Sequence, residues 1–534
     1  SEQNEALHDV IIAGLGPTGA VLANILGQKG WSVIGVEREE DLYYAPRAVH
    51  FDDEIMRIFQ SIGLDAAIGR TSEPFTDMEL LTRAGGKPWL RMKIGTQDRR
   101  YGHPGAWWFH QPTLEQHFKD GMARFDTVQA LRGWEIVGIE QDGESVTATV
   151  QGPAGQTRRL RGRYLIGCDG GRSFVRTAAG LKLQSADFDE AWVVVDTKAR
   201  CGGKDPTLPA NHQQICDPRQ PVTYVPMAGP YYEWQFMVMG GKSEREATDP
   251  AFVRKKLRPF VALDRIDITR IAYYRFHALW ARKWRNGRIV LAGDAAHQMP
   301  PFLGQGMCAG VRDAANLGWR LDLILSGRAD DAVLDDYEAE RAEHVGHIIR
   351  GAMLLGRIVQ TRKPWLASLR NYGLFLPANT VPALRNLLYR SANRKRPLSR
   401  GFWGRNRPKL AGHQAPQPII RHHGRDCLLD EVTGLDFALI SRRGSLSMHQ
   451  AVIARLEEGG FLRHIQIGDQ IGSDTCSPAV IGWMRDENVD FVILRPDRYV
   501  FDGGTAQEFP AVAEAYLRGM PPSSRTSATE RAAA

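Results

Sequence analysis

A glycine-rich turn, GLGPTG at residues 14–19, restricts the fold of this 534-residue chain more than any other feature. It follows a short apolar stretch, Val10 to Ala13, and leads into an apolar periodicity of helical type from about Thr18 to Lys29. A second β-branched stretch, Ser32 to Val36, comes next. The order strand, glycine turn, helix and strand predicts an α/β fold whose first helix points its N-terminus at a bound phosphate.

The glycines and one acidic residue have separate predicted roles in holding a dinucleotide. The first glycine allows the tight turn, the second lets the backbone approach a pyrophosphate, and the third lets the helix pack on the strand. Glu37, at the end of the second strand, can accept hydrogen bonds from both hydroxyls of a ribose. The alternative is a glycine-rich loop in another kind of α/β protein, and the turn alone does not decide between NAD and FAD. The residues expected to contact the dinucleotide here are Gly14, Gly16, Pro17, Thr18, Gly19 and Glu37.

The composition is that of a chain with more than one hydrophobic core. Hydrophobic residues make up 43% of the sequence, which is enough for two or three domains. The first residues are polar and no run of about 18 uncharged apolar residues follows, so we expect neither a secretion signal nor a membrane span. The six cysteines form no CxxC pair and no metal-ligand spacing with histidines. This pattern favours a cytoplasmic protein without a metal site.

The net charge of +7 is unevenly distributed. Arg385 to Lys409 contains nine Lys and Arg residues and no acidic residue. A nucleic-acid patch is one interpretation of such a run. The prolines and glycines within it favour a solvated linker instead, and we expect no nucleic-acid partner.

Three further segments have distinct patterns. From about Val128 to Ile166, short alternating strands are broken by the hairpin turns QDGES and QGPAGQ. From about Phe188 to Tyr274, aromatic and β-branched residues predict strands that form a candidate substrate platform. After the basic run, strand and helix signals such as DFALISRRG and SMHQAVIARLEE indicate a small separate α/β domain.

Two more strand-to-turn motifs carry chemistry. YLIGCDGGRSFVR ends a strand at Cys168 and places Asp169 in a turn, and IVLAGDAAH places Gly293 and Asp294 in another. Together with the glycine turn, they resemble the three signatures of the single-component FAD-dependent aromatic hydroxylases, the class A flavoprotein monooxygenases. PRAVHFDDE, QPTLEQ and GQGMCAGVRDAANLGWRL follow in the expected order. The resemblance covers nearly the whole chain and is strongest to the 3-(3-hydroxyphenyl)propionate/3-hydroxycinnamate hydroxylase subfamily.

This resemblance implies three domains: a Rossmann-like FAD-binding domain of the para-hydroxybenzoate hydroxylase type, an inserted β-sheet substrate domain, and a C-terminal thioredoxin-like domain. The expected division is 1–80, 101–186 and 279–380 for the FAD-binding domain, 81–100 and 187–278 for the substrate domain, 381–410 for the basic linker, 411–520 for the C-terminal domain and 521–534 for a disordered tail.

The resemblance also assigns residues to FAD. Asp294 is expected to hydrogen-bond the ribityl chain, and Pro300 to Met307 to lie along the isoalloxazine. The next helix then aims its N-terminus at the pyrimidine end of the flavin, where a flavin oxygen can replace a side-chain cap. The other residues expected at FAD are Arg38, Arg47, Gln111, Asp169, Gly293, Pro301, Gly304, Gln305, Gly306 and Met307. A surface salt bridge for Arg47 and helix-capping roles for Gln111 and Asp169 remain open alternatives.

The implied reaction is a hydroxylation driven by NADH or NADPH. Reduced FAD reacts with O2 to a C4a-hydroperoxide, which transfers one oxygen to a phenolic ring, and a base that removes the phenolic proton makes that ring more nucleophilic. His50 is the first candidate for this proton transfer. Asp52 could instead begin a helix, and Tyr224 could be a core residue. The candidate residues of the substrate pocket are His212, Tyr224, Trp234 and Pro300.

The expected substrate is a hydroxyphenyl-alkanoate such as 3-(3-hydroxyphenyl)propionate. Another phenol or a polycyclic aromatic is a close alternative within the same family. A flavin oxidoreductase or epoxidase of the same fold, and a flavin-bound sensor without turnover, are alternatives of other classes. We further expect a homodimer.

Overall fold

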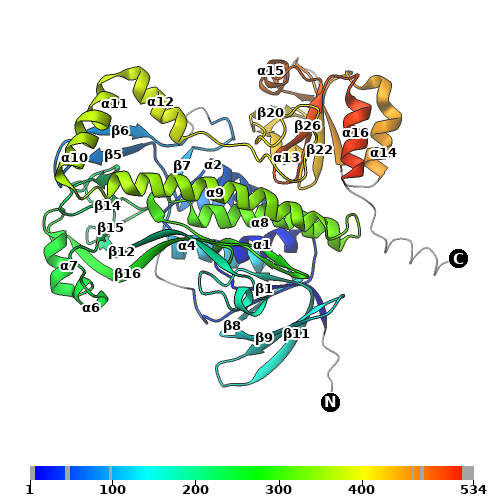
Figure 1. The fold of residues 1–534 in the computed structure, drawn as a ribbon. Helices are drawn as coiled ribbons and strands as arrows, with labels where there is room; N and C mark the ends of the chain where they lie inside the picture. The colour runs from blue at the N-terminus through cyan, green and yellow to red at the C-terminus, as the bar shows by residue number, and fades with distance from the viewer. Residues whose placement is uncertain (1–5, 43–47, 96–98, 459–461, 470–473, 520–534) are drawn as a thin grey trace.

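The computed structural model describes residues 6–42, 48–95, 99–458, 462–469 and 474–519. Two large sheets, joined by two long helices, form the body of the molecule, and a smaller α/β unit lies beside them (Figure 1). Within the described ranges, no helix is both long and apolar enough to cross a membrane.

The first sheet carries the glycine turn. Its strands are β1 (Leu7–Ala13), β2 (Val33–Glu37), β8 (Val128–Arg132), β9 (Glu135–Gln141), β10 (Val146–Gln151), β11 (Thr157–Gly167), β17 (Arg285–Asn286) and β18 (Ile289–Leu291). They follow the order β17-β18-β11-β1-β2-β8, with β18, β11, β1, β2 and β8 parallel and β9 and β10 attached as antiparallel strands. Parallel strands need crossover connections. The central strands β2 and β18 and the end of β1 are buried, whereas the edge strand β8 is partly exposed.

Three helices pack beside this sheet, and two of them, α1 and α8, meet at its glycine turn. They are α1 (Pro17–Gln28), α8 (Gly306–Leu325) and α9 (Val333–Val359). The predicted strand, turn, helix and strand are confirmed as β1, α1 and β2. The helices α1 and α8 approach closely, since a Cβ on Gly318 would lie 2.7 Å from the Ile25 side chain. In Figure 1, α9 runs across the middle of the molecule next to α8.

The second sheet is the predicted substrate platform. Its strands are β5 (Asp77–Leu81), β6 (Leu90–Lys93), β12 (Leu183–Ala199), β13 (His212–Ile215), β14 (Val222–Val225), β15 (Tyr231–Met237), β16 (Ile266–Ala281) and β19 (His297–Gln298), in the order β19-β16-β12-β15-β14-β13-β5-β6. One face packs on α6 (Glu244–Ala247) and α7 (Pro250–Leu257). The other face turns toward the start of α8, because Trp192 on β12 contacts Phe302 at a ring-centroid distance of 5.7 Å.

Three short strands that flank β5 and β6 in sequence form a small third sheet. It consists of β3 (His50–Asp52), β4 (Glu73–Pro74) and β7 (Ala106–Trp108), and the helices next to it are α2 (Asp53–Ser61) and α4 (Gln111–Met122). In the register of this sheet, His50 stands opposite Trp108.

The C-terminal unit is a four-stranded sheet with its own helices. The strands β22 (Phe437–Arg442), β23 (Leu462–Ile467), β25 (Phe491–Leu494) and β26 (Val500–Gly504) follow the order β23-β22-β25-β26, and α14 (Gln450–Glu458), α15 (Pro478–Asp486) and α16 (Phe509–Arg518) accompany them. The strands and helices observed in this unit agree with the sequence signals for strands and helices in the same segment. We retain the predicted division of the chain into domains as a proposal.

The basic run before this unit is not a fully solvated linker. Its first part forms the end of α12 (Pro382–Ala392), which follows α10 (Pro364–Arg370) and α11 (Leu376–Thr380). The ammonium group of Lys395 is also paired with buried Asp53 and contacts Gln414. Buried acidic partners, far away in sequence, therefore give this segment a structural role that its composition does not reveal.

Candidate active site

A cleft of about 200 Å³ opens in front of the N-terminus of α1. Gly14 adopts a left-handed φ of 89°, and a Cβ there would lie 2.5 Å from the carbonyl oxygen of Cys168. A Cβ on Gly16 would meet no atom within 4 Å. The backbone at the second glycine thus faces open space, as a bound pyrophosphate requires. Predicted residues that line the cleft are Gly14, Gly16, Pro17, Glu37, Arg38, Gln111 and Asp169.

The Glu37 carboxylate lines this cleft. Its Oε2 accepts a hydrogen bond from the Leu15 amide at 2.9 Å, and its Oε1 accepts one from the Glu39 amide at 3.1 Å. Each carboxylate oxygen has a second lone pair, so both can still accept from ribose hydroxyls. Arg38 is mostly exposed and pairs with Glu39.

Two further polar residues that line the cleft are fixed by the fold. The Gln111 side chain is buried, accepts from the Ala48 amide at 2.9 Å and donates to Glu115 at 2.7 Å. Asp169 accepts hydrogen bonds from Ser173 and from the amide of Val175, at the start of α5 (Phe174–Ala178). Burial raises the pKa of Asp169. Arg47 lies outside the described residues.

The GDAAH turn follows β18 and stands against α1. Gly293 has a left-handed φ of 62°, and a Cβ there would lie 2.6 Å from the hydroxyl oxygen of Thr18. The Gly293 amide donates to buried Asp313 at 2.9 Å. Asp294 is exposed at the tip of this turn. A glycine is therefore required for close packing here, while the next carboxylate faces outward.

The proline- and glycine-rich loop ends at the N-terminus of α8. Pro301 to Leu303 forms a single 3₁₀ turn, and Gly304 takes a left-handed φ of 60°. Gln305 is the N-cap residue, and no described side chain caps the helix, so the first amides are free for a ligand. A Cβ on Gly304 would lie 2.6 Å from Nδ1 of His50, which places this imidazole directly beside the loop.

His50 belongs to an aromatic cluster between the small sheet and the substrate platform. Its ring makes edge contacts with Phe75 at 5.7 Å and Trp108 at 6.1 Å, and Trp108 contacts His212 at 5.7 Å. Burial lowers the pKa of His50, and it lowers the pKa of His212 to about 3. Both imidazoles are thus neutral near pH 7. A neutral imidazole can accept a proton.

Both oxygens of the Asp52 carboxylate already have partners within the protein. Its Oδ1 accepts from the amide of Ile55 at 3.2 Å as the N-cap of α2, and its Oδ2 is paired with Arg312. Burial alone would raise the pKa of Asp52, but the charge of Arg312 lowers it. These contacts fit the helix-start alternative and favour His50 for proton transfer.

Tyr224 and Trp234 lie on the side of the platform that faces away from His212. Side chains alternate along strands, and both aromatics point toward α6 and α7 and pack with Tyr232 in that core. The Tyr224 hydroxyl donates to the Pro209 carbonyl at 2.8 Å. The structure therefore corrects the expectation that these two residues line the pocket. Pro300 is buried in the loop before α8.

The polar neighbours of these aromatics occupy the face of His212. Gln214 contacts the imidazole at 3.0 Å and accepts from the Thr223 hydroxyl at 2.8 Å. Gln235 stands opposite Thr223 in the register of β14 and β15 and donates to Glu233 at 2.5 Å. These residues are not among the sequence predictions, although the alternation of polar and aromatic residues in YEWQFMV was a usable signal.

The Glu233 carboxyl on this face should make the stability of the protein depend on pH. Burial and, second, repulsion from Asp196 raise the pKa of Glu233 to about 8 from its ordinary 4.5. Because the native state then holds the proton more tightly, stability falls as the pH rises between these two values. We expect the free energy of unfolding of the wild type to fall by on the order of 2 kcal/mol between pH 6 and 8, relative to that of Glu233→Gln. Urea unfolding at both pH values measures this, and parallel pH dependences of the two proteins would contradict it.

The residues of the glycine turn before α1, of the GDAAH turn and of the loop before α8 fit FAD. The cleft before α1 offers open backbone at its second glycine and the Glu37 carboxylate in its lining. The free N-terminus of α8 lies beside the aromatic cluster around His50. One helix N-terminus suits a pyrophosphate, and the other suits the electron-rich edge of a flavin ring.

Comparisons with known proteins agree with this assignment. The family model described as "FAD binding domain" matches residues 8–352, and the model described as "HcaD C-terminal domain" matches 412–519. A 3-(3-hydroxy-phenyl)propionate/3-hydroxycinnamic acid hydroxylase from Mycolicibacterium smegmatis is 34% identical, over 95% of this chain and 92% of that protein. A probable NADH-specific resorcinol 4-hydroxylase from Rhodococcus jostii is 32% identical, over 96% of this chain and 95% of that protein.

Solved structures share the fold. The flavin-dependent monooxygenase PieE, solved with FAD and substrate, superposes with a TM-score of 0.83 at 22% identity, over 96% of this chain and 99% of that chain. Aklavinone-11 hydroxylase, solved with FAD and aklavinone, gives a TM-score of 0.75 at 22% identity, over 97% and 100%. The predicted architecture is thereby confirmed.

Proposed function

Because the chain belongs to the FAD-dependent aromatic hydroxylases, we propose that its substrate is a phenol carrying an alkanoate side chain, such as 3-(3-hydroxyphenyl)propionate. The protein is an FAD-dependent monooxygenase that uses a nicotinamide electron donor and O2 on a small aromatic substrate. The name of the Mycolicibacterium smegmatis relative supports the alkanoate. The single structural observation that supports a phenolic substrate is the position of His50 and its aromatic neighbours directly beside the loop before α8.

We propose that the described loops hold FAD in three parts. The α1 turn and Glu37 take the pyrophosphate and adenosine ribose, and Asp294 takes the ribityl chain. The loop from Pro300 to Gln305, together with the first amides of α8, takes the ring. When bound, FAD supplies electron transfer from the nicotinamide and activation of O2.

The chain's own contribution to the reaction is proton control and exclusion of water. His50 is partly buried and its pKa is lowered by desolvation, so at neutral pH it can accept the phenolic proton. Phe75 and Trp108 pack around the imidazole and keep water away. Gln214 and Thr223 present polar groups on the platform face. These residues orient the ring and hold its hydroxyl near Nδ1 or Nε2 of His50.

A substrate panel tests this function. The FAD-loaded protein is mixed with phenols with and without an alkanoate side chain, and oxidation of NADH and NADPH is followed with the mass of the product. We expect faster oxidation with a hydroxyphenyl-alkanoate, coupled to a product heavier by one oxygen atom. Donor oxidation that no phenol stimulates would refute the proposal.

A second candidate substrate is resorcinol or another phenol without a carboxylate. The name of the Rhodococcus jostii relative, which covers the chain equally well, supports it together with NADH as the donor. In the panel, this candidate is favoured if resorcinol is turned over at least as efficiently as the hydroxyphenyl-alkanoates.

Replacement of His50 separates proton transfer from flavin reduction. We expect His50→Ala to lower the rate of hydroxylation about a hundredfold, as loss of a general base does, while donor oxidation continues and releases peroxide. Product and peroxide are quantified together. His117→Ala, at a histidine that contacts Thr71 outside the cleft, serves as the matched control. An unchanged product yield in His50→Ala would remove His50 from the mechanism.

Cytoplasmic location and a homodimer complete the proposal. The scattered cysteines, all free thiols, support the first. An exposed apolar surface on and after α10, with Trp365 and Leu369 each more than 60% accessible, supports the second. Sedimentation of the purified protein measures the assembly state.

A further inference from the structure

Arg312 ties the start of α8 to the strand that carries His50. Its side chain is 7% exposed. Nη1 donates to the side-chain oxygen of Gln305 at 2.9 Å, Nη2 is paired with Asp52, and Nε donates to Glu54 at 2.7 Å. One guanidinium group therefore fixes the N-cap of α8 and the first turn of α2 relative to each other. Its planar geometry suits this task.

The Glu54 carboxylate has a second partner from a distant part of the chain. Its Oε1 accepts a hydrogen bond from the Tyr499 hydroxyl at 2.7 Å. Glu54 is 6% exposed and Tyr499 is 8% exposed. The two carboxylate oxygens are thus divided between Arg312, on the helix that begins at the flavin loop, and Tyr499, in the C-terminal unit.

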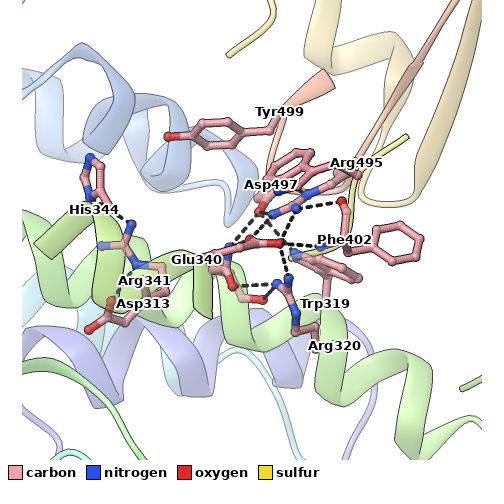
Figure 2. A network of polar contacts seen from close by, with 12 residues as sticks. Asp313, Trp319, Arg320, Glu340, Arg341, His344, Phe402, Arg495, Asp497 and Tyr499 are labelled. Carbon is pink, nitrogen blue, oxygen red and sulfur yellow. Dashed lines mark hydrogen bonds and ion pairs between the residues drawn. The ribbon is translucent and has the colours of Figure 1, made fainter. Parts of the chain in front are cut away.

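A buried ionic network holds the C-terminal unit in register for this contact. The Glu340 carboxylate on α9 accepts from Arg495 at 2.8 and 2.9 Å and from Arg320 on α8 at 2.7 Å. Asp497 pairs with Arg495 and accepts from the Trp319 indole at 3.1 Å. Figure 2 shows these side chains converging between the helices and the C-terminal unit, with the Tyr499 ring beside them and its hydroxyl directed away from Arg495.

We propose that Tyr499 is a positioning residue of the flavin site, which acts from the C-terminal unit through Glu54 and Arg312 on the N-terminus of α8. This inference rests on the proposed function, since it takes the α8 N-terminus as the flavin-facing element. It gives the C-terminal unit a part in tuning the cofactor, although that unit contributes no residue to the loops described above.

The direction of the effect follows from the charges. The Tyr499 hydroxyl donates toward Glu54 and compensates part of its negative charge. Without that donor, the charge of Glu54 is compensated only by Arg312 and, second, by Lys395, and less of the Arg312 charge remains for Gln305 and Asp52. The region around the α8 N-terminus then becomes more negative. Reduced flavin gains negative charge, so the loss of the hydroxyl disfavours reduction.

The experiment measures the flavin midpoint potential of the full-length, FAD-loaded protein by dye equilibration. We expect Tyr499→Phe to lower the ratio of reduced to oxidised flavin three- to tenfold at a fixed potential, as couplings through packed networks do. That change corresponds to a potential about 15–30 mV more negative for a two-electron couple. Tyr516→Phe is the matched control, because its hydroxyl is buried in the same unit without a hydrogen-bond partner among the described residues. The control potential should equal that of the wild type.

A double-mutant cycle tests the route through Glu54. Glu54→Gln removes the charge that both partners share, so Tyr499→Phe should shift the potential much less in that background than in the wild type. Equal shifts in both backgrounds, or a Tyr499→Phe potential equal to that of the control, would overturn the proposal. If Tyr499→Phe is not recovered folded, Glu54→Gln alone carries the test, and an unchanged potential in that variant overturns the proposal equally. Potentials need no substrate, so these outcomes are independent of whether a phenol is hydroxylated.

Discussion

Glu340→Ala is expected to destabilise the protein by about 3–5 kcal/mol, the cost of removing one partner from a buried ion pair. The Glu340 side chain is fully buried and is shared by Arg320 and Arg495, whose side chains are equally buried. Burial alone would raise the pKa of Glu340, but these two guanidinium groups lower it. Its removal leaves two cations facing each other without the carboxylate between them. Urea unfolding monitored by tryptophan fluorescence measures the loss.

Asp335→Ala is the matched control for this prediction. Asp335 lies on the same helix and is also paired with an arginine, Arg285, but its side chain is 75% exposed. An exposed pair of this kind contributes about 0–1 kcal/mol. If Glu340→Ala unfolds no more easily than Asp335→Ala, the buried network does not hold the C-terminal unit in place.

Asp294→Ala is expected to weaken FAD binding about ten- to a hundredfold. The carboxylate is exposed at the tip of the GDAAH turn, and loss of a charged acceptor from a ligand hydroxyl costs about 1.5–3 kcal/mol. Gly293 and its contact with Thr18 are unaffected by the change, so the turn should keep its shape. Flavin absorbance of the purified variant and titration of the apoprotein with FAD measure occupancy and affinity.

Two further variants serve as controls for this prediction. Asp294→Asn keeps an acceptor oxygen and should retain most of the flavin, whereas Asp126→Ala, an exposed residue outside the cleft lining, should bind FAD like the wild type. An Asp294→Ala protein that purifies fully yellow with wild-type affinity would contradict the assignment of this turn to the cofactor.

Local sequence constraints explain why the cofactor loops were predictable. Gly14 and Gly293 both adopt a left-handed φ within their turns, and a Cβ on either would also collide with a segment far away in sequence, at Cys168 or at Thr18. Such positions admit only glycine, and they leave a motif that can be read from one sequence. The elements β1, α1 and β2 accordingly lie within a few residues of their predicted bounds.

The residues of the substrate side were harder to predict, because strand register decides them. Tyr224 and Thr223 are neighbours in sequence, yet one packs on α6 and α7 and the other faces His212. A one-residue difference in register exchanges the two faces of a strand. The aromatic richness of the segment drew attention to Tyr224 and Trp234, but large aromatic side chains are most often core residues.

Contacts between distant segments left no sequence signal at all. Glu54 and Tyr499 are 445 positions apart, and Glu54 and Arg312 are 258 apart. Each of these residues lies in a segment whose sequence is typical of an ordinary surface helix or loop. Only the folded chain shows that these side chains are buried together, and that the C-terminal unit reaches the start of α8.

The contact between Gly304 and His50 has a consequence for how such a site can be redesigned. Any side chain at 304 would enter the space of the imidazole and would also require a strained backbone conformation. The loop and the histidine therefore cannot be varied independently. Because His50 is also the proposed base, a library that aims at a bulkier substrate should keep Gly304 and His50 as a pair and diversify other positions.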